Sequence, residues 1–169
     1  LFTVNTGHAA LAYLGHRAGL RFIHEVSARP EILATAEAAL RESGAGLQAR
    51  HALSGPGHEN YIRSTLARFA NPVLADELTR VARSPLRKLG PDERLIAPAR
   101  LAAAAGIEPR AFARVIAAAL RYDFAGDPEA VSLQAALRRE GPAATLTRLT
   151  GLAASDPLHR AVLTHYHAS

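Results

Sequence analysis

Three steps of an acidic residue followed by proline divide the second half of the chain into helix-length segments. Glu108-Pro109, Asp127-Pro128 and Asp156-Pro157 each stand directly before a helix-forming stretch. This step is typical of a helix start, because proline fits the first turn. Asp127 is in addition a good cap for free backbone N–H groups. No stretch alternates apolar and polar residues for long, so no strand is predicted. The sequence therefore predicts an all-α fold.

Similar signals bound the helices of the first half. Gly19 is a typical C-terminal stop for the first helix, whose apolar residues go almost all the way round and indicate a buried central helix. Residues 22–27 are too few to assign. No linker composition splits the chain, so one domain over residues 1–169 is expected. Helices are expected at Val4–Ala18, Pro30–Arg50, His58–Phe69, Val73–Ala82, Asp92–Ala105, Pro109–Tyr122, Asp127 to Gly141-Pro142, a short one to Leu149, and Asp156–Tyr166.

The composition of the 169 residues excludes several kinds of partner and site. Cysteine is absent, which excludes disulfides and thiolate sites. No apolar run is long enough to span a membrane and no leader pattern is seen, so a cytoplasmic location without a membrane partner is expected. The net charge of +5 comes from scattered arginines, and aromatic residues make up only 5%. Without a stacking platform, no nucleic-acid partner is expected.

The eight histidines do not form a metal-binding pattern. His8, His16 and His24 recur every eight residues, and eight residues of helix turn about 80°, so the three side chains diverge. No HExxH motif is present, and no metal is expected. Gly44-Ala45-Gly46 follows helical residues and no strand, so it is interpreted as a helix stop and not as a dinucleotide-binding loop.

Asn5 and His8 form a candidate catalytic pair. On a helix, a separation of three places both side chains on one face, roughly 60° apart. The amide and the neutral imidazole each offer a hydrogen-bond donor and an acceptor, so the pair could orient a hydroxyl or carbonyl oxygen of a small substrate. Alternatively, His8 is a hydrogen-bonded core histidine and Asn5 a helix cap. The spacing alone leaves both interpretations open.

Four basic residues form a candidate substrate-binding stretch: Arg80, Arg83, Arg87 and Lys88. The three arginines share a stripe if a helix persists, and a turn at Pro85 would fan them out. Arginine's planar fork suits a phosphate dianion, and lysine adds a point charge. The alternative is a solvated face with a few surface ion pairs.

Several motifs carry a resemblance to a known family. They are Asn5-Thr6-Gly7-His8 with Ala-Tyr-Leu-Gly at 12–15, Arg-Phe-Ala-Asn-Pro at 68–72, Arg-Ser-Pro-Leu-Arg-Lys-Leu at 83–89 and Asp-Glu-Arg-Leu-Ile-Ala-Pro at 92–98. In this order they resemble the polyol-specific long-chain dehydrogenases, in particular the mannitol-1-phosphate 5-dehydrogenase group. The similarity runs from Leu1 to about Leu152.

The resemblance implies a multi-helical C-terminal substrate domain of a zinc-independent enzyme. Such an enzyme interconverts mannitol 1-phosphate and fructose 6-phosphate with NAD(H), which a separate N-terminal nucleotide-binding domain holds. Asn5 and His8 match the residues that polarise the reacting oxygen, and the basic stretch would bind the phosphate. The family's catalytic lysine would stand one residue before Leu1. The chain alone is therefore expected to be inactive, and the parent enzyme to be a monomer.

Two alternatives remain open. The chain could be a stand-alone helical binding or interaction domain, which an upstream nucleotide-binding fold would exclude. It could also come from a relative that acts on unphosphorylated mannitol (a mannitol 2-dehydrogenase) or on a uronate. Arg87-Lys88-Leu89 weighs against this second alternative.

Overall fold

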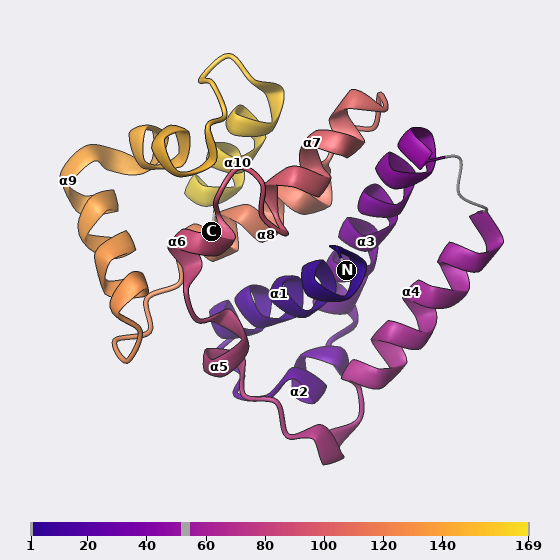
Figure 1. Ribbon diagram of the computed structural model, residues 1–169. Helices are drawn as coiled ribbons and strands as arrows, with labels where there is room; N and C mark the ends of the chain where they lie inside the picture. Colours follow the sequence, from indigo (N-terminus) through magenta and orange to yellow (C-terminus); the bar gives the residue numbers. More distant parts are fainter. Residues whose placement is uncertain (1, 52–54, 169) are drawn as a thin grey trace.

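The computed structural model describes residues 2–51 and 55–168, which form a bundle of helices (Figure 1). An isolated antiparallel bridge between Phe22 and Glu77 is the single β-type pairing among these residues. The all-α prediction is confirmed. The elements are α1 (Phe2–Arg17), α2 (Ile23–Ser27), α3 (Pro30–His51), α4 (Gly55–Phe69), the 3₁₀ helix η1 (Pro72–Leu74), α5 (Leu78–Ala82), α6 (Pro85–Lys88), α7 (Ile96–Ala104), α8 (Arg110–Leu120), α9 (Pro128–Thr150) and α10 (Pro157–His167).

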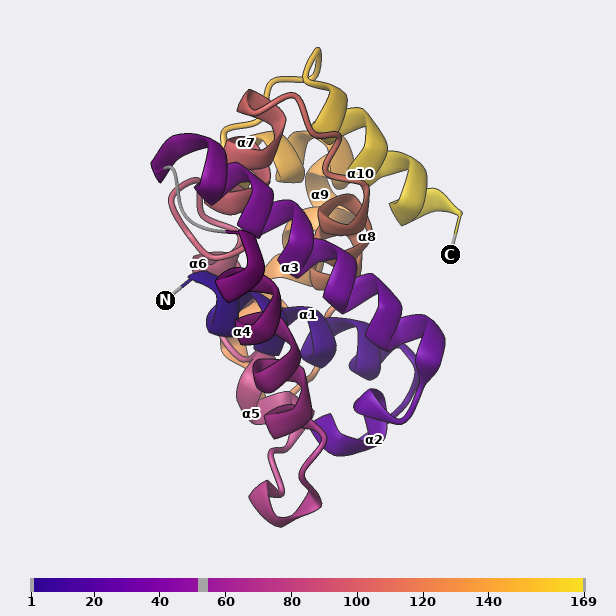
Figure 2. The ribbon, with the colours of Figure 1, turned by 90° about the vertical axis from the view of Figure 1, so that its right-hand side faces the viewer.

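Helix α1 lies at the centre of the bundle, as its apolar sequence predicts. It packs against α2, α3, α4, α5 and α8, and the side chains from Ala9 to Tyr13 are buried. A helix that is apolar all round is stabilised most when other helices surround it, because all its faces are then removed from water. The start of α1 and the end of α10 lie on opposite sides of the molecule (Figure 2).

Glycines allow the helices around α1 to approach closely. A Cβ atom on Gly46 would lie 2.7 Å from the backbone nitrogen of Ala102, so α3 and α7 touch through their backbones there. A Cβ on Gly15 would lie 2.3 Å from Val26 Cγ2, which brings α2 onto α1. Helix α3 continues through Gly44 and Gly46, so the interpretation of these glycines as a helix stop is wrong.

Two predicted helices start later than the sequence suggests. The expected helix over Val73–Ala82 is wrong, because Ala75 adopts a left-handed conformation (φ 44°) that separates η1 from α5. Asp92 does not cap a helix either, since α7 begins at Ile96. Pro98 therefore stands in the first turn of α7, where its missing N–H group costs no hydrogen bond.

Other boundaries differ by less. Helix α4 begins at Gly55, three residues before the predicted start at His58. The unassigned residues 22–27 contain α2, whose first turn is held by Glu25 Oε2 accepting the Phe22 N–H over 2.8 Å. The predicted boundary at Gly141-Pro142 is a kink inside α9, where Gly141 has φ 80°.

Candidate functional site

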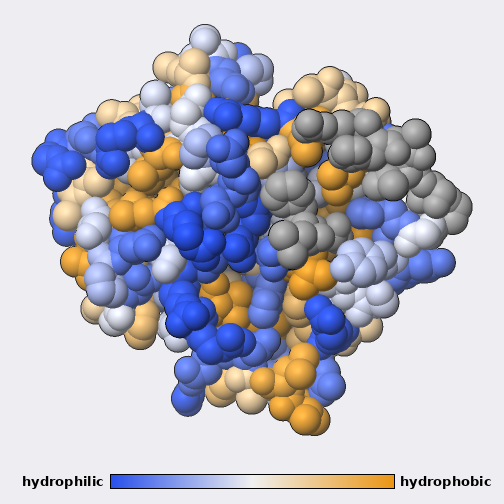
Figure 3. All heavy atoms as spheres, in the orientation of Figure 1, coloured by the Kyte–Doolittle hydropathy of each residue, from blue (hydrophilic) through white to orange (hydrophobic). Residues whose placement is uncertain are grey.

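The first half of α1 carries both residues that the sequence predicts as catalytic. Asn5 and His8 are half-buried and lie three residues apart, close to one turn of the helix. The Asn5 side chain makes no hydrogen bond with any of the described residues, so its amide remains uncommitted within this part of the chain. Figure 3 shows the side of the molecule on which α5 and α6 lie, and hydrophilic residues gather over these two helices.

The imidazole of His8 is held flat against Phe69 at the end of α4. The two ring centroids are 4.7 Å apart and the ring planes differ by 13°. Gly7 makes this approach possible, because a Cβ atom there would lie only 3.3 Å from Phe69 Cε2. The Gly7-His8 pair thus has a physical reason: the glycine leaves room for the ring against which the histidine stacks.

Asp76 meets the edge of the His8 ring. Asp76 Oδ2 lies 3.2 Å from the buried His8 Nε2, a distance typical of an ion pair, although the angle is not that of a good hydrogen bond. The other carboxylate oxygen, Oδ1, accepts from the guanidinium of Arg80. The structure therefore connects Arg80, predicted as a substrate-binding residue, to His8 through a carboxylate that sequence reasoning missed.

Several charges act on the His8 imidazole in opposite directions. Burial lowers its pKa below the ordinary 6.5 and is the largest effect. The carboxylate of Asp76 raises the pKa, while Arg80 and Arg68 lower it. Because the net shift is downward, His8 is neutral at pH 7, so one ring nitrogen donates a hydrogen bond and the other accepts one.

Tyrosine side chains hold the short helix α5 in place beside α1. Tyr13 is buried within α1, and its hydroxyl donates to the carbonyl of Ala82 over 2.8 Å. The hydroxyl of Tyr122, at the end of α8, donates to the carbonyl of Thr79 over 3.3 Å. The Ala82 carbonyl lies at the C-terminal end of α5, where helix carbonyls lack a partner inside the helix, whereas the Thr79 carbonyl also accepts the Arg83 N–H over 3.2 Å.

Lys88, in α6, also donates hydrogen bonds to backbone carbonyls at the end of α5 and just after it. Its side chain is 3% exposed, and Nζ donates to the carbonyl of Val81 over 2.6 Å and to that of Arg83. Burial lowers the pKa of Lys88 to about 8, and neighbouring arginines add to the effect. The ammonium group is thus directed at backbone carbonyls, whereas its predicted contact with phosphate stays a prediction.

The remaining basic residues diverge after α5. Arg87 Nη1 lies 3.3 Å from Glu93 Oε1, so its guanidinium faces an acidic side chain. Arg83 makes no side-chain hydrogen bond or ion pair with any of the described residues. Because the chain turns at Ser84, which has φ 63°, the predicted stripe of three arginines does not persist beyond α5.

Asp127 fixes the corner at which the chain turns. Its Oδ2 accepts the Ser84 N–H over 2.8 Å, and its Oδ1 accepts the Glu129 N–H over 3.0 Å at the start of α9. The predicted N-cap role of Asp127 is confirmed. The same side chain also orients the segment that carries Arg83.

A cavity of about 370 Å³ opens beside this corner. Its walls are α5 and the loop between α8 and α9. Two guanidinium groups, two hydroxyl groups and one carboxylate line it, those of Arg80, Arg83, Thr79, Ser84 and Asp127, and the carboxylate already accepts two backbone N–H groups. Guanidinium and hydroxyl donors together suit an anionic oxygen-rich group. Arg80 thus belongs both to this cavity and to the His8–Asp76 cluster.

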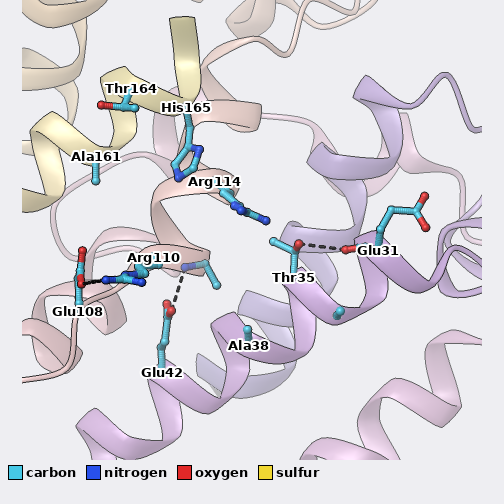
Figure 4. A pocket seen from close by; sticks show the side chains of 12 residues that line it. Glu31, Thr35, Ala38, Glu42, Glu108, Arg110, Arg114, Ala161, Thr164 and His165 are labelled. Carbon is cyan, nitrogen blue, oxygen red and sulfur yellow. Dashed lines mark hydrogen bonds and ion pairs between the residues drawn. The ribbon is translucent and has the colours of Figure 1, made fainter. Parts of the chain in front are cut away.

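A larger hollow, of about 580 Å³, lies between α3, α8 and α10 and contains none of the predicted site residues (Figure 4). Three of its charged side chains, those of Glu42, Glu108 and Arg110, already have partners. Glu42 accepts the N–H groups of Ala111 and Phe112 at the start of α8, and Glu108 pairs with Arg110. The polar contacts of Glu42 around this hollow are those of a helix cap, and they give no support for a catalytic site.

The described residues contain neither a cluster of metal ligands nor a nucleotide-binding motif. No group of three or more His, Asp or Glu residues that could hold a metal ion occurs in residues 2–51 and 55–168. The same residues contain no βαβ unit, the motif that binds dinucleotides in doubly wound folds. No helix of the described chain is long and apolar enough to cross a membrane.

Comparisons with known proteins cover almost the whole chain. Residues 1–168 match the family model of the mannitol dehydrogenase C-terminal domain. The mannitol-1-phosphate 5-dehydrogenase of Bacillus subtilis (strain 168) is 47% identical over 163 residues, which are 96% of this chain and 43% of that protein. The enzyme of the same name from Paenarthrobacter aurescens (strain TC1) is 43% identical over 162 residues, 96% of this chain and 42% of that protein.

A solved structure also matches almost the whole chain. The mannitol 2-dehydrogenase of Pseudomonas fluorescens, in a ternary complex with NAD and D-mannitol, superposes with a TM-score of 0.71 at 25% identity. The match covers 98% of this chain and 36% of that one. The chain thus spans less than half the length of the relatives that it matches.

Proposed function

Because the chain belongs to the mannitol dehydrogenase C-terminal domain family, we propose that it is the substrate-binding part of an NAD-dependent mannitol-1-phosphate 5-dehydrogenase. The observation that carries the proposal is the meeting of His8, Asp76 and Arg80 at the start of α1. The proposed reaction oxidises mannitol 1-phosphate to fructose 6-phosphate. The nucleotide and the base would be supplied outside residues 1–169, in a cytoplasmic enzyme whose N-terminal domain binds NAD(H).

In this proposal Asn5 and His8 hold the reacting oxygen. Negative charge develops on this oxygen when the hydroxyl proton leaves, before the hydride departs from the carbon that bears the oxygen, and a fixed donor stabilises that charge. The Asn5 amide can donate without losing a partner among the described residues. The neutral imidazole of His8 is fixed in orientation by Phe69 and Asp76, so it presents one ring nitrogen to the substrate.

The phosphate is proposed to bind beside the same cluster. Arg80 and Arg83 line the cavity of about 370 Å³ together with two hydroxyl groups, which supports them as phosphate ligands. Arg87 faces Glu93, and Lys88 caps backbone carbonyls. Among the four predicted residues, Arg83 is therefore the first to test.

The catalytic roles are tested by alanine substitution in a complete dehydrogenase that contains this chain. Asn5→Ala and His8→Ala should each lower kcat and kcat/KM. The first removes a donor to the developing oxyanion, a loss that costs about 2.7–4 kcal/mol. The second removes the ring that accepts from the substrate hydroxyl and orients it. Cofactor affinity should not change. The control His167→Ala removes an exposed histidine near the C-terminus and should keep full activity. An unchanged kcat in His8→Ala would contradict its assignment.

The choice between phosphorylated and unphosphorylated substrate needs a separate test, because the Pseudomonas relative acts on mannitol itself. Arg83→Ala should raise KM for mannitol 1-phosphate about tenfold to hundredfold, since a charge-assisted hydrogen bond contributes about 1.5–3 kcal/mol. Turnover of mannitol should change little. Arg87→Ala serves as the comparison and should have the smaller effect. Equal losses with both substrates would favour a mannitol 2-dehydrogenase.

A further inference from the structure

The backbone around Asp76 is held by hydrogen bonds on both sides, and this fixes the position of Asp76 at the candidate site. Its carbonyl accepts the Ile23 N–H over 2.9 Å, and Leu78 N–H donates to Arg21 O over 2.9 Å. This pairing surrounds the isolated bridge between residues 22 and 77. The carboxylate therefore projects from a fixed segment and not from a free loop.

The two oxygens of Asp76 serve different partners. Oδ2 faces His8 Nε2 at 3.2 Å, and Oδ1 accepts from Arg80. A surface ion pair alone would contribute little to stability, because the median is about 0–1 kcal/mol. Asp76 is only 24% exposed, however, and the ring nitrogen that it faces is buried.

The ring of His8 is constrained in two independent ways. Phe69 fixes the plane of the imidazole, and Asp76 lies at its Nε2 edge. A carboxylate beside one ring nitrogen favours the tautomer that carries the proton on that nitrogen. The second nitrogen, Nδ1, is then unprotonated and can accept a hydrogen bond from a substrate hydroxyl.

We propose that Asp76 is a positioning residue that keeps the proton of neutral His8 on Nε2, leaves Nδ1 to face the reacting oxygen, and couples this orientation to Arg80. The inference rests on the proposed function, because only a reacting oxygen near His8 gives the tautomer a catalytic meaning. Asp76 would act through His8 and Arg80 and would not touch the substrate itself.

The tautomer can be measured in the chain of residues 1–169 without any activity assay. Long-range ¹H–¹⁵N correlation spectra report which imidazole nitrogen carries the proton and follow the titration of each histidine. In the wild type, His8 should carry its proton on Nε2. The charged groups that face His8 are Asp76, Arg80 and Arg68. Asp76→Asn should lower the titration midpoint of His8 and mix its tautomers, because only the two arginines then remain.

The Arg80→Ala variant should shift the titration midpoint of His8 in the opposite direction. Arg80→Ala removes a positive charge and should raise the midpoint of His8, whereas a purely structural defect would not move the two variants in opposite directions. The control Asp92→Asn changes an exposed carboxylate and should leave His8 unaffected. An unshifted midpoint in Asp76→Asn would overturn the proposal. If that variant does not fold, a wild-type proton on Nδ1 overturns it equally.

An activity measurement in the complete dehydrogenase then separates the two proposals. Asp76→Asn should lower kcat/KM by about tenfold or more, as the loss of an orienting partner typically does, and Asp76→Glu should restore part of it. An unaltered kcat/KM in Asp76→Asn, with His8→Ala inactive, would overturn the role of Asp76. Full activity in His8→Ala would instead overturn the proposed function, while the spectra would still support Asp76 as the residue that orients the ring.

Discussion

Lys88 is expected to make the stability of the chain depend on pH in an unusual direction. Its pKa is about 8 in the folded chain, against an ordinary 10.5, because burial disfavours the charged ammonium group. Between these values an unfolded chain keeps the proton that the folded chain has lost. Stability rises with pH wherever the unfolded state binds more protons. The free energy of unfolding should therefore increase by about 1–2 kcal/mol between pH 7 and pH 9.5.

Urea denaturation followed by far-ultraviolet circular dichroism, at half-unit steps of pH, measures this increase. Tyr13 and Tyr122 do not interfere, because burial raises the pKa of both above the ordinary 10, that of Tyr122 to about 12. Lys88→Met should abolish the increase, and the control Arg87→Met, which changes the exposed neighbour, should retain it. A free energy that stays level or falls up to pH 9.5 in the wild type would refute the account of Lys88.

Two further predictions concern packing. Glu42→Ala removes the carboxylate that caps the first turn of α8 and should cost about 1–2 kcal/mol in urea denaturation, whereas Glu31→Ala, an exposed change on the same helix, should cost far less. If Glu42→Ala and Glu31→Ala lowered the free energy of unfolding by about the same amount, the cap would be dispensable. Gly46→Ala places a Cβ 2.7 Å from the backbone of Ala102 and should cost about 1–3 kcal/mol, measured by thermal unfolding; wild-type stability would mean that α7 can move away freely.

Local patterns were enough to predict the helical class and most helix ends, because caps and prolines act on their own turn. Asp127 and Asp156 cap helices as expected. Ala75 was missed, because alanine gives no sign of a left-handed conformation. The predicted helix start at Asp92 was wrong for another reason. A good capping residue does not by itself determine where a helix begins.

The candidate site was only partly predictable. Asn5 and His8 are neighbours on one helix, so their spacing was informative. Asp76 approaches His8 from a distant part of the chain and could not be identified from a local pattern, although its position four residues before Arg80 was a usable signal for an ion pair. The burial of Lys88 was hidden for another reason: its partners are backbone carbonyls, which every sequence contains.

The two hydrogen bonds of Asp127 have a consequence for the order in which the chain can assemble. The corner at Ser84 is closed by a side chain 43 residues further on, which also starts α9. During synthesis α5 and α6 emerge first, and the left-handed turn between them has no acceptor for its N–H until residue 127 leaves the ribosome. The segment that carries Arg83 therefore reaches its final position only after α7 and α8 have been synthesised.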